Sequence, residues 1–328
     1  ATRWERAGRA GEPVDVAADM MRLTLEVVAA CLFGAGIGEE DSRLVGLRLT
    51  EAVEAIFKQT FGPPFLAKLP TPSHRRLARA VRDLDRVVVG LIQARRAQLE
   101  AGAEVRHDLL DTLISATDPD TGRGLSETQL RDEAMTLFLA GHETTASHLA
   151  WTFHLLGTRP EEQEKLGSEA RGVIGEKAVA MEDLARLEFC RRVLDESLRL
   201  YPPAWWISRT PQVDDEVAGF GIKKGSVVVM SPYVVHRHPA FWDDPERFDP
   251  DRFLPQRVQA RPKLAYVPFG AGPRFCIGNV FAQVESQIVL STLMSRFRVE
   301  PVEGNVVRRS PQVTLRPSGG PVMRITLR

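Results

Sequence analysis

A cysteine at position 276 follows a glycine-rich stretch and precedes apolar spacing typical of an amphipathic helix. Gly270 and Gly272 permit backbone angles closed to other residues and let a flat ligand approach closely, while Pro273 stiffens the turn. Because Cys276 lies near the start of the expected helix, backbone N–H groups and the positive end of the helix dipole favour a thiolate there. Such a thiolate suits a soft metal, and haem iron above all. The local pattern also fits a buried structural thiol, since free cysteine behaves as a small apolar residue.

A second place for chemistry lies in the middle of the longest expected helix. Residues 126–129, Ser-Glu-Thr-Gln, match a capping box, and the next breaker is Arg159-Pro160, so we expect one helix over residues 126–158. Its middle reads Ala-Gly-His-Glu-Thr-Thr at residues 140–145. Glycine costs about 1 kcal/mol inside a helix, and threonine hydroxyls can bond to carbonyls one turn earlier and bend it. The stretch indicates either a functional break or a close helix crossing at Gly141 beside a capped carboxylate.

A third candidate is a pair of opposite charges on the helix expected over residues 181–200. Glu196 and Arg199 are three residues apart, so their carboxylate and guanidinium lie on one helix face. On an exposed face such a pair contributes only a few tenths of a kcal/mol to stability. The spacing alone is therefore compatible with an ordinary surface ion pair.

After this helix the residues favour short strands and then an irregular segment. Runs at 205–209, 215–220 and 227–235 predict strands. Residues 237–262 are rich in Pro, Asp and Arg and predict a long meander. The tail from 297 to 328 alternates enough for hairpin strands.

The histidines do not form a metal site at their spacings. His142, His148 and His154 are six residues apart on one expected helix, so at about 100° per residue their side chains point about 120° away from one another. His236 and His238 lie in a loop context with no carboxylate or cysteine at ligand spacing. We expect both of them to be structural.

Other reaction classes are disfavoured by motifs and composition. The sequence contains no GxSxG, HExxH or P-loop pattern, which argues against acyl transfer, zinc-dependent hydrolysis and nucleotide hydrolysis. The GxGxG at residues 34–38 follows an expected helix instead of a strand, so we interpret it as a turn. Lys and Arg number 43, as do Asp and Glu, and this balance gives no reason to expect a nucleic-acid partner.

The length of 328 residues suffices for one large domain or two ordinary ones. Three widely spaced cysteines imply no disulfide framework and suit a reducing compartment, so we expect a cytoplasmic protein. No apolar run is long enough to predict a transmembrane segment. The sequence begins at Ala1 with neither an initiator Met nor a signal-peptide pattern, and a membrane anchor before Ala1 stays compatible with it.

The three candidate features and the arginine-bearing meander occur in an order that resembles the cytochrome P-450 family of haem-thiolate monooxygenases. Residues 140–144 fit the family's oxygen-activating segment, and residues 196–199 fit its ExxR pair. The cysteine loop fits the pattern FxxGxRxCxG at Phe269, Gly272, Arg274, Cys276 and Gly278. The resemblance covers essentially the whole chain. It implies a mainly α fold, a prism of helices around haem with a minor β-rich region.

The resemblance also implies how the chain is organised. Residues 1–328 would form a single domain, helical at about 1–200, with strands, meander, cysteine loop and proximal helix at about 201–328. The first helices of the family fold and the Trp-x-x-x-Arg motif of its third helix are absent from the sequence, and Trp4 with Arg3 does not fit that motif. We therefore expect the sequence to be part of a longer protein whose missing helices precede Ala1.

Roles at the haem follow from the resemblance. Cys276 would be the axial ligand of haem b (iron protoporphyrin IX), and Phe269 with the loop amides would shield its sulfur. On the opposite haem face Gly141 would leave a groove for dioxygen, while Glu143 and Thr144 would deliver protons through water.

Arginines would hold the haem and the core. Arg209 and Arg274 would bind the haem propionates. The ExxR pair would be completed by an arginine of the meander, for which the sequence offers Arg247 and Arg252. Because the family places a Pro-x-x-Phe shortly before its Pro-x-Arg-Phe, the order favours Arg252.

The family places its substrate pocket after the ExxR pair, along the long helix and in the C-terminal hairpin. The corresponding residues are mostly apolar or aromatic, which favours a hydrophobic substrate such as a fatty acid, a terpenoid or an aromatic compound. They are Phe138, Ala140, Thr145, Ala204, Trp205, Trp206, Val313 and Thr314. Since Trp205 and Trp206 are adjacent, only one of them can face the pocket from a strand.

The implied reaction inserts one oxygen atom from dioxygen into an organic substrate, with electrons from NAD(P)H. No flavin or iron–sulfur motif occurs in the sequence, so electrons would come from a ferredoxin, a flavoprotein reductase or a domain outside it. Arg191, Arg192 and Lys263 are either docking cations for that partner or a solvated face. The alternatives are a peroxygenase or isomerase, which would not need Thr144, and a non-catalytic haem-binding protein or fragment.

Overall fold

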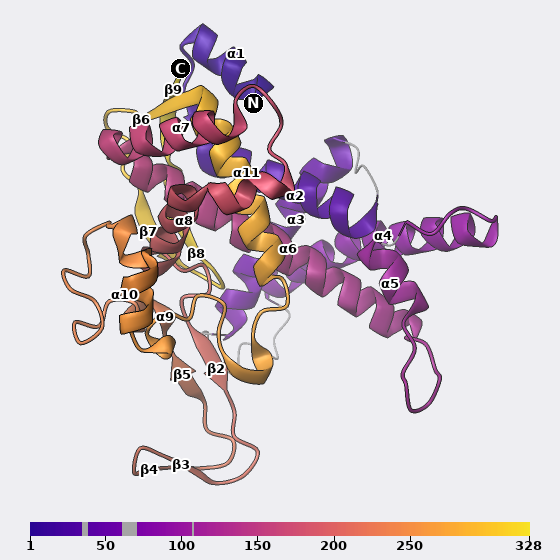
Figure 1. Cartoon of the computed structure of the whole chain (residues 1–328). Coiled ribbons are helices and arrows are strands. Elements are labelled where there is room, and N and C mark those ends of the chain that lie inside the picture. The colour runs from indigo at the N-terminus through magenta and orange to yellow at the C-terminus, as the bar shows by residue number, and fades with distance from the viewer. Residues whose placement is uncertain (35–38, 61–70, 107) are drawn as a thin grey trace. The chain divides into compact units, whose positions relative to one another are not determined.

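The computed structural model describes residues 1–34, 39–60, 71–106 and 108–328 (Figure 1). Helices make up 59% and strands 11%, which confirms the predicted mainly α fold class. None of the described helices is both long and apolar enough to cross a membrane. The chain divides into two compact units, one formed by residues 17–146 and the other by residues 1–16 with 147–328.

The unit of residues 17–146 is built from helices. They are α2 (Val16–Phe33), α3 (Glu39–Thr60), α4 (Pro72–Glu100), α5 (Leu109–Ser115) and the first part of α6 (Glu127–Gly157). α3 packs along α4, and α4 buries the apolar stripe Leu84, Val88 and Ile92. Near the end of α4 the buried Arg95 guanidinium donates hydrogen bonds of 2.5 and 2.6 Å to Asp111 of α5. Residues 35–38 of the predicted glycine-rich turn lie outside the described residues.

The long helix α6 begins and ends close to its predicted limits. The Ser126 N–H donates to the Gln129 side chain at 3.0 Å, and the Gln129 N–H donates to Ser126 Oγ at 3.3 Å. This reciprocal pair is the predicted capping box. Beyond residue 147 the helix buries large side chains such as Trp151 and Phe153, so this part belongs to the core of the other unit.

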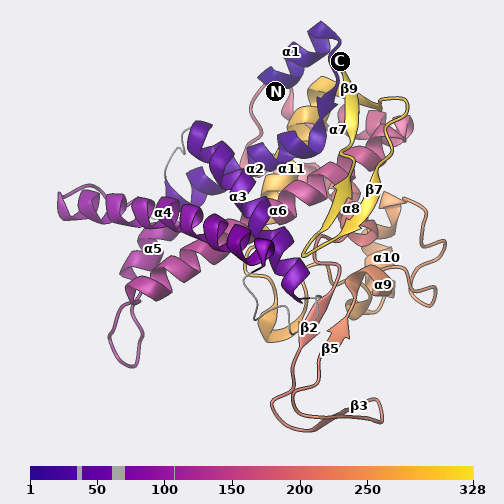
Figure 2. The same cartoon turned by 180° about the vertical axis from the view of Figure 1, so that it is seen from behind.

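The unit of residues 1–16 and 147–328 combines helices with an antiparallel sheet. The sheet order is β1 (Val14–Asp15), β9 (Val322–Leu327) and β6 (Phe297–Pro301). α1 (Thr2–Ala10) lies beside β9 (Figure 2). Its Trp4 ring packs edge-on against Phe153 and Phe297, with ring centroids 5.3 and 5.8 Å apart. The core helices α7 (Pro160–Ile174), α8 (Glu188–Leu200) and α11 (Asn279–Arg296) pack against one another.

The same unit carries several short elements. Its paired strands are β2 (Ile207–Arg209) with β5 (Val228–Met230), β3 (Asp215–Val217) with β4 (Phe220–Ile222), and β7 (Arg308–Pro311) with β8 (Leu315–Ser318). Its short helices are α9 (Pro232–Val235), α10 (Pro255–Ala260), η2 (Met181–Arg186), η3 (Pro250–Phe253), η4 (Lys263–Ala265) and η5 (Gly272–Arg274). The β3–β4 hairpin extends beyond the β2–β5 pair (Figure 1). The hairpin strands predicted for the tail are present as β6 to β9.

Two predicted boundaries are wrong for local reasons. The strand predicted over residues 227–235 ends at Met230, because Pro232 starts α9 and the Ser231 hydroxyl accepts the Val234 N–H at 3.4 Å. The helix predicted over residues 181–200 is divided into η2 and α8 at Leu187, whose ψ of 58° is not helical. As the N-cap of α8, Leu187 accepts the Arg191 N–H on its carbonyl at 3.1 Å, and the same carbonyl also accepts from the Gln287 side chain at 3.0 Å.

Candidate functional site

The cysteine loop runs from Phe269 to Gly278, between η4 and α11. Gly270 and Gly272 have φ angles of +76° and +70°, a region that favours glycine. The Cys276 N–H donates to the Phe269 carbonyl at 3.0 Å, and α11 begins at Asn279 with Gly278 as its N-cap. The loop therefore fixes the cysteine backbone just before a helix N-terminus.

The side chains of this loop are exposed. Cys276 carries a free, exposed thiol, and the neighbouring Phe275 and Ile277 are 49% and 90% exposed. Clustered exposed apolar side chains mark a surface for a ligand or partner. A thiolate flanked by apolar side chains fits haem, whose iron takes an axial cysteine ligand. The residues present thus fit the cofactor that the sequence predicts.

The ExxR pair forms a buried support in the same unit. Arg199 Nε and Nη2 donate to the two oxygens of Glu196 at 2.7 and 2.8 Å, and both side chains are 0% exposed. Arg199 also donates to the carbonyls of His236, Pro245 and Arg247 at 3.0, 2.7 and 3.1 Å. Burial raises the pKa of Glu196, although the hydrogen bond and charge of Arg199 oppose it. The pair is therefore a cross-link between α8 and the meander.

Of the two candidate third arginines, the structure brings Arg252 to Glu196. Arg252 Nε lies 3.5 Å from Glu196 Oε1, and its Nη2 donates to the Asp244 carbonyl at 2.8 Å. The Arg247 side chain is instead 63% exposed and bonds to Asp249 at 3.2 Å. Only the backbone of Arg247 contributes to the buried support.

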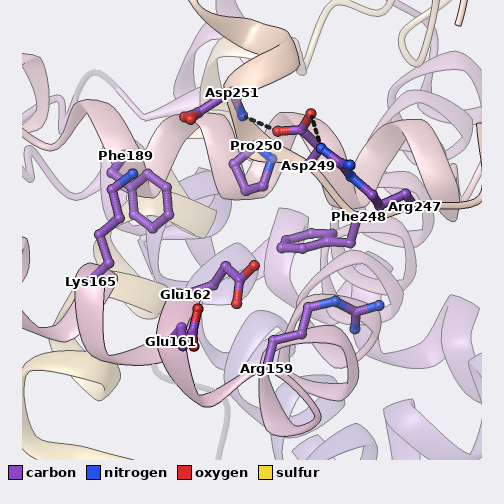
Figure 3. Close-up of a pocket in the computed structure, with 10 residues that line it drawn as sticks. All are labelled: Arg159, Glu161, Glu162, Lys165, Phe189, Arg247, Phe248, Asp249, Pro250 and Asp251. Carbon is purple, nitrogen blue, oxygen red and sulfur yellow. Dashed lines mark hydrogen bonds and ion pairs between the residues drawn. The ribbon is translucent and has the colours of Figure 1, made fainter. Parts of the chain in front are cut away.

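Arg247 also lines a cleft of about 620 Å³, where it lies beside Asp249 (Figure 3). Most of the residues that line it carry charged side chains, so the cleft does not suit an apolar substrate. The lining residues are Arg159, Glu161, Glu162, Lys165, Phe189, Arg247, Phe248, Asp249, Pro250 and Asp251. None of them belongs to the cysteine loop or to the predicted substrate pocket.

In the unit of residues 17–146, α6 carries the predicted oxygen-activating residues. The Thr144 hydroxyl donates to the Ala140 carbonyl at 2.7 Å, as the sequence suggested for a helix threonine. Ala140 is exposed and Thr144 is half-buried, so this side of α6 is accessible. Glu143 is only 3% exposed and Thr145 is buried.

Gly141 lies where α6 crosses α2. A Cβ added at Gly141 would lie 3.2 Å from Val28 Cγ2, which is tighter than an ordinary contact. The Thr24 hydroxyl donates to the His142 carbonyl at 3.0 Å at the same crossing. The missing side chain therefore permits close helix packing, the alternative that the sequence left open. The dioxygen groove at Gly141 stays a prediction.

The remaining predicted residues fall into separate groups. Arg209 and Arg274 are exposed. Trp205 Nε1 donates to the Gln312 carbonyl at 2.9 Å, which brings residues 204–206 beside the turn at 313–314. Trp205 and Trp206 are both half-buried, so burial does not distinguish which of them faces a pocket. Phe138, Ala140 and Thr145 belong to α6 in the other unit.

The helical fold, the ExxR support and the cysteine loop define a haem-thiolate protein. A family model described as Cytochrome P-450 matches residues 2–322, and the chain belongs to this family. Membership confirms the predicted class, a P-450 monooxygenase with haem b and a cysteine thiolate ligand. The family uses dioxygen, a substrate and a redox partner. The roles of the individual residues stay predictions.

The particular relatives include several bacterial oxygenases. The chain is 38% identical over 320 residues to cyclooctatin synthase of Streptomyces melanosporofaciens, covering 97% of this chain and 69% of that protein. It is 39% identical over 300 residues to cyclooctat-9-en-7-ol 5-monooxygenase of the same organism, covering 90% and 64%. Pentalenene oxygenase of Streptomyces avermitilis is 37% identical over 300 residues, covering 91% and 65%. The chain thus spans about two thirds of the length of these relatives.

A solved structure shows the same fold. The haem domain of cytochrome P-450DA superposes with a TM-score of 0.87 at 29% identity, over 100% of this chain and 70% of that one. None of the relatives named above is described as a peroxygenase or an isomerase. The similarities to these relatives and to the solved structure therefore do not favour a peroxygenase, an isomerase or a non-catalytic haem-binding protein.

Proposed function

We propose that the full-length protein inserts one oxygen atom from dioxygen into a hydrophobic, hydrocarbon-like substrate. The observation that supports this most is the Cys276 loop, with its exposed thiol and apolar flanks in the same unit as the buried Glu196–Arg199 support. Two relatives are named for the oxidation of cyclooctat-9-en-7-ol and of pentalenene, an alkenol and an alkene. The mostly apolar set of predicted pocket residues agrees with that chemistry.

The chain's own residues would contribute binding, positioning and proton handling. Haem b supplies dioxygen activation and oxygen insertion when it is bound. Cys276 Sγ would be its ligand, with the cysteine amide held by the Phe269 carbonyl. The Thr144 hydroxyl gives its single hydrogen to the Ala140 carbonyl and keeps lone pairs that can accept from water. A water held by the Thr144 hydroxyl in this way would donate toward the dioxygen, and Glu143 would supply protons to that water.

Electrons would come from a separate ferredoxin or flavoprotein reductase, or from a further domain. Of the predicted docking cations, Arg191 and Lys263 are exposed. Arg192 is only 14% exposed and forms an ion pair with Asp251, so it is poorly placed for a partner. Reversing the charge of Arg191 and Lys263 should slow reduction most at low salt, because screening weakens such attraction. The predicted cytoplasmic localisation stays a prediction.

The test is reconstitution of the full-length protein with haem and a reductase system. We expect substrate-dependent NAD(P)H consumption, and we expect isotope from labelled dioxygen to appear in the product. Thr144→Ala should consume NAD(P)H with less product per electron pair, because proton delivery is impaired. Label incorporation from water instead of dioxygen would contradict the proposal.

A further inference from the structure

His236 is a fully buried histidine at the end of α9, outside the residues assigned above. Its Nε2 accepts the Val267 N–H at 2.9 Å. Its own carbonyl accepts from Arg199 Nη1 at 3.0 Å. One residue therefore contacts the ExxR support through its backbone and the chain entering the cysteine loop through its ring.

Val267 leads directly into the cysteine loop. The Val267 carbonyl accepts the Gly270 N–H at 3.1 Å, which closes a turn at the first loop glycine. The Phe269 carbonyl within that turn accepts the Cys276 N–H at 3.0 Å. Consecutive hydrogen bonds thus run from the ring of His236 to the backbone of Cys276.

The hydrogen bond to Val267 specifies the protonation of the ring. Because Nε2 accepts, it carries no proton, and the neutral imidazole must carry its hydrogen on Nδ1. Burial lowers the pKa of His236 to about 3, with the Arg199 and Arg237 charges in the same direction and the backbone of Arg199 and Leu198 opposing. The Tyr266 ring packs against the His236 ring at a tilt of 36°, with ring centroids 5.2 Å apart. Burial and the nearby arginine charges thus keep the imidazole neutral, so that Nε2 can accept a hydrogen bond, while the Tyr266 ring packs against it.

We propose that His236 is a positioning residue that, as a neutral imidazole, holds Val267 and thereby orients the Cys276 loop against the Glu196–Arg199 support. This rests on the proposed role of Cys276 as haem ligand. The side chain does not touch the thiol and acts through the backbone of the loop. Its loss should loosen the loop without removing the ligand.

The test compares three substitutions in the full-length protein. His236→Leu removes the acceptor, His236→Asn reaches only the Nδ1 position, and His236→Gln can place an oxygen near the Nε2 position. His238→Leu is the matched control, because His238 lies two residues away and is exposed; its ring accepts the Ala240 N–H at 3.2 Å and lies 5.2 Å from the Phe241 ring. Amide exchange at Val267 and Cys276 is measured with the fraction of the carbon monoxide complex that shows the thiolate-type Soret band.

We expect exchange at both amides to rise roughly tenfold or more in H236L and H236N, because a buried N–H loses its partner. The thiolate-type fraction should fall in both variants, while H236Q and H238L stay close to wild type. If H236L does not fold, H236N gives the same comparison. The proposal would be overturned if the amides of Val267 and Cys276 exchanged at the wild-type rate in H236L or H236N. It would also be overturned if these amides exchanged as fast in H236Q as in H236L. Absence of the thiolate band from wild type would instead overturn the haem assignment. The amide-exchange data would then still show whether His236 holds Val267 and the cysteine loop.

Discussion

The ExxR support and the cysteine loop belong to the same unit and differ in almost every physical respect. In the support, Glu196 and Arg199 are 0% exposed, and the Arg199 nitrogens bond to the carboxylate and to three carbonyls. In the loop, Cys276 is exposed and Ile277 is 90% exposed. The support therefore consists of charges that only the fold can satisfy, whereas the loop presents side chains to a ligand.

This difference separates stability from ligation. Removing one partner of a buried ion pair leaves an uncompensated charge, which is far more costly than losing an exposed contact. An exposed loop side chain can be replaced at little cost to folding. Substitutions in the two regions should accordingly affect different measurements.

The largest effect is expected at the loop. Cys276→Ala should abolish the thiolate-type Soret band of the carbon monoxide complex, because the only predicted sulfur ligand is gone. The free energy of unfolding of the cofactor-free protein should change by no more than about 0.5 kcal/mol, since the side chain is exposed. Survival of that band in C276A would mean that the haem assignment is wrong.

The support should show the converse behaviour. Glu196→Gln should lower the free energy of unfolding by about 3–5 kcal/mol, because Arg199 and Arg252 lose their buried counter-charge. Glu246→Gln is the matched control, since Glu246 is 69% exposed and pairs with Arg237 at 2.8 Å. Its cost should be below about 1 kcal/mol. Equal denaturation midpoints for the two variants would remove the distinction between the regions.

A further prediction tests which arginine of the meander interacts with Glu196. A double-mutant cycle should give a coupling free energy of about 0.5–3 kcal/mol between Glu196 and Arg252. The coupling of Glu196 with the exposed Arg247 side chain should be close to zero, because Arg247 contributes only its carbonyl. If Glu196 coupled to Arg247 and not to Arg252, Arg247 would be the third arginine of the support.

The last expected effect is a dependence of stability on pH. An unfolded histidine titrates near pH 6.5, whereas folded His236 has a pKa of about 3, so only the unfolded state gains this proton between those values. Stability is therefore lost as pH falls from 6.5, by about 1.4 kcal/mol per pH unit for this group. His148, with a pKa of about 4, acts in the same direction. Asp195, with its pKa raised by burial to about 6, opposes both.

Comparing wild type with a His236 variant separates the contribution of His236 to the pH dependence from those of His148 and Asp195. His236→Gln should reduce the loss of stability between pH 6 and pH 4 by about 1.4 kcal/mol per unit, because glutamine does not titrate. The measurement is urea unfolding of wild type and variant across this range. Parallel curves would show that the imidazole is not kept neutral by the fold.

Sequence reasoning reached the features whose signals are local. The capping box at Ser126 and Gln129 and the positive-φ glycines of the cysteine loop have signals in short stretches. The preference for Arg252 over Arg247 comes instead from the order of motifs in the family that the sequence resembles, and Arg252 lies 3.5 Å from Glu196. It misjudged residues 227–235, since an apolar run fits strand and buried helix alike, although Ser231-Pro232 was a usable start signal.

Other features depend on partners that no local pattern reveals. The sequence predicts a structural role for His236, but it does not reveal the partner, because the hydrogen bond to Val267 spans 31 residues. Val28, which explains the glycine at position 141, lies on another helix. The cost or benefit of such residues depends on tertiary packing, which overrides local propensity.

The pairing of β1 with β9 has a consequence for synthesis of the chain. Val14 lies opposite Met323, so strands from opposite ends of the sequence must meet. During translation α1 and β1 would leave the ribosome long before β9 exists, whereas most of residues 17–146 would already be free to fold. Contacts of such high sequence separation form slowly. The segment of residues 1–16 would thus dock late onto the rest of its unit and stay accessible to chaperones until then.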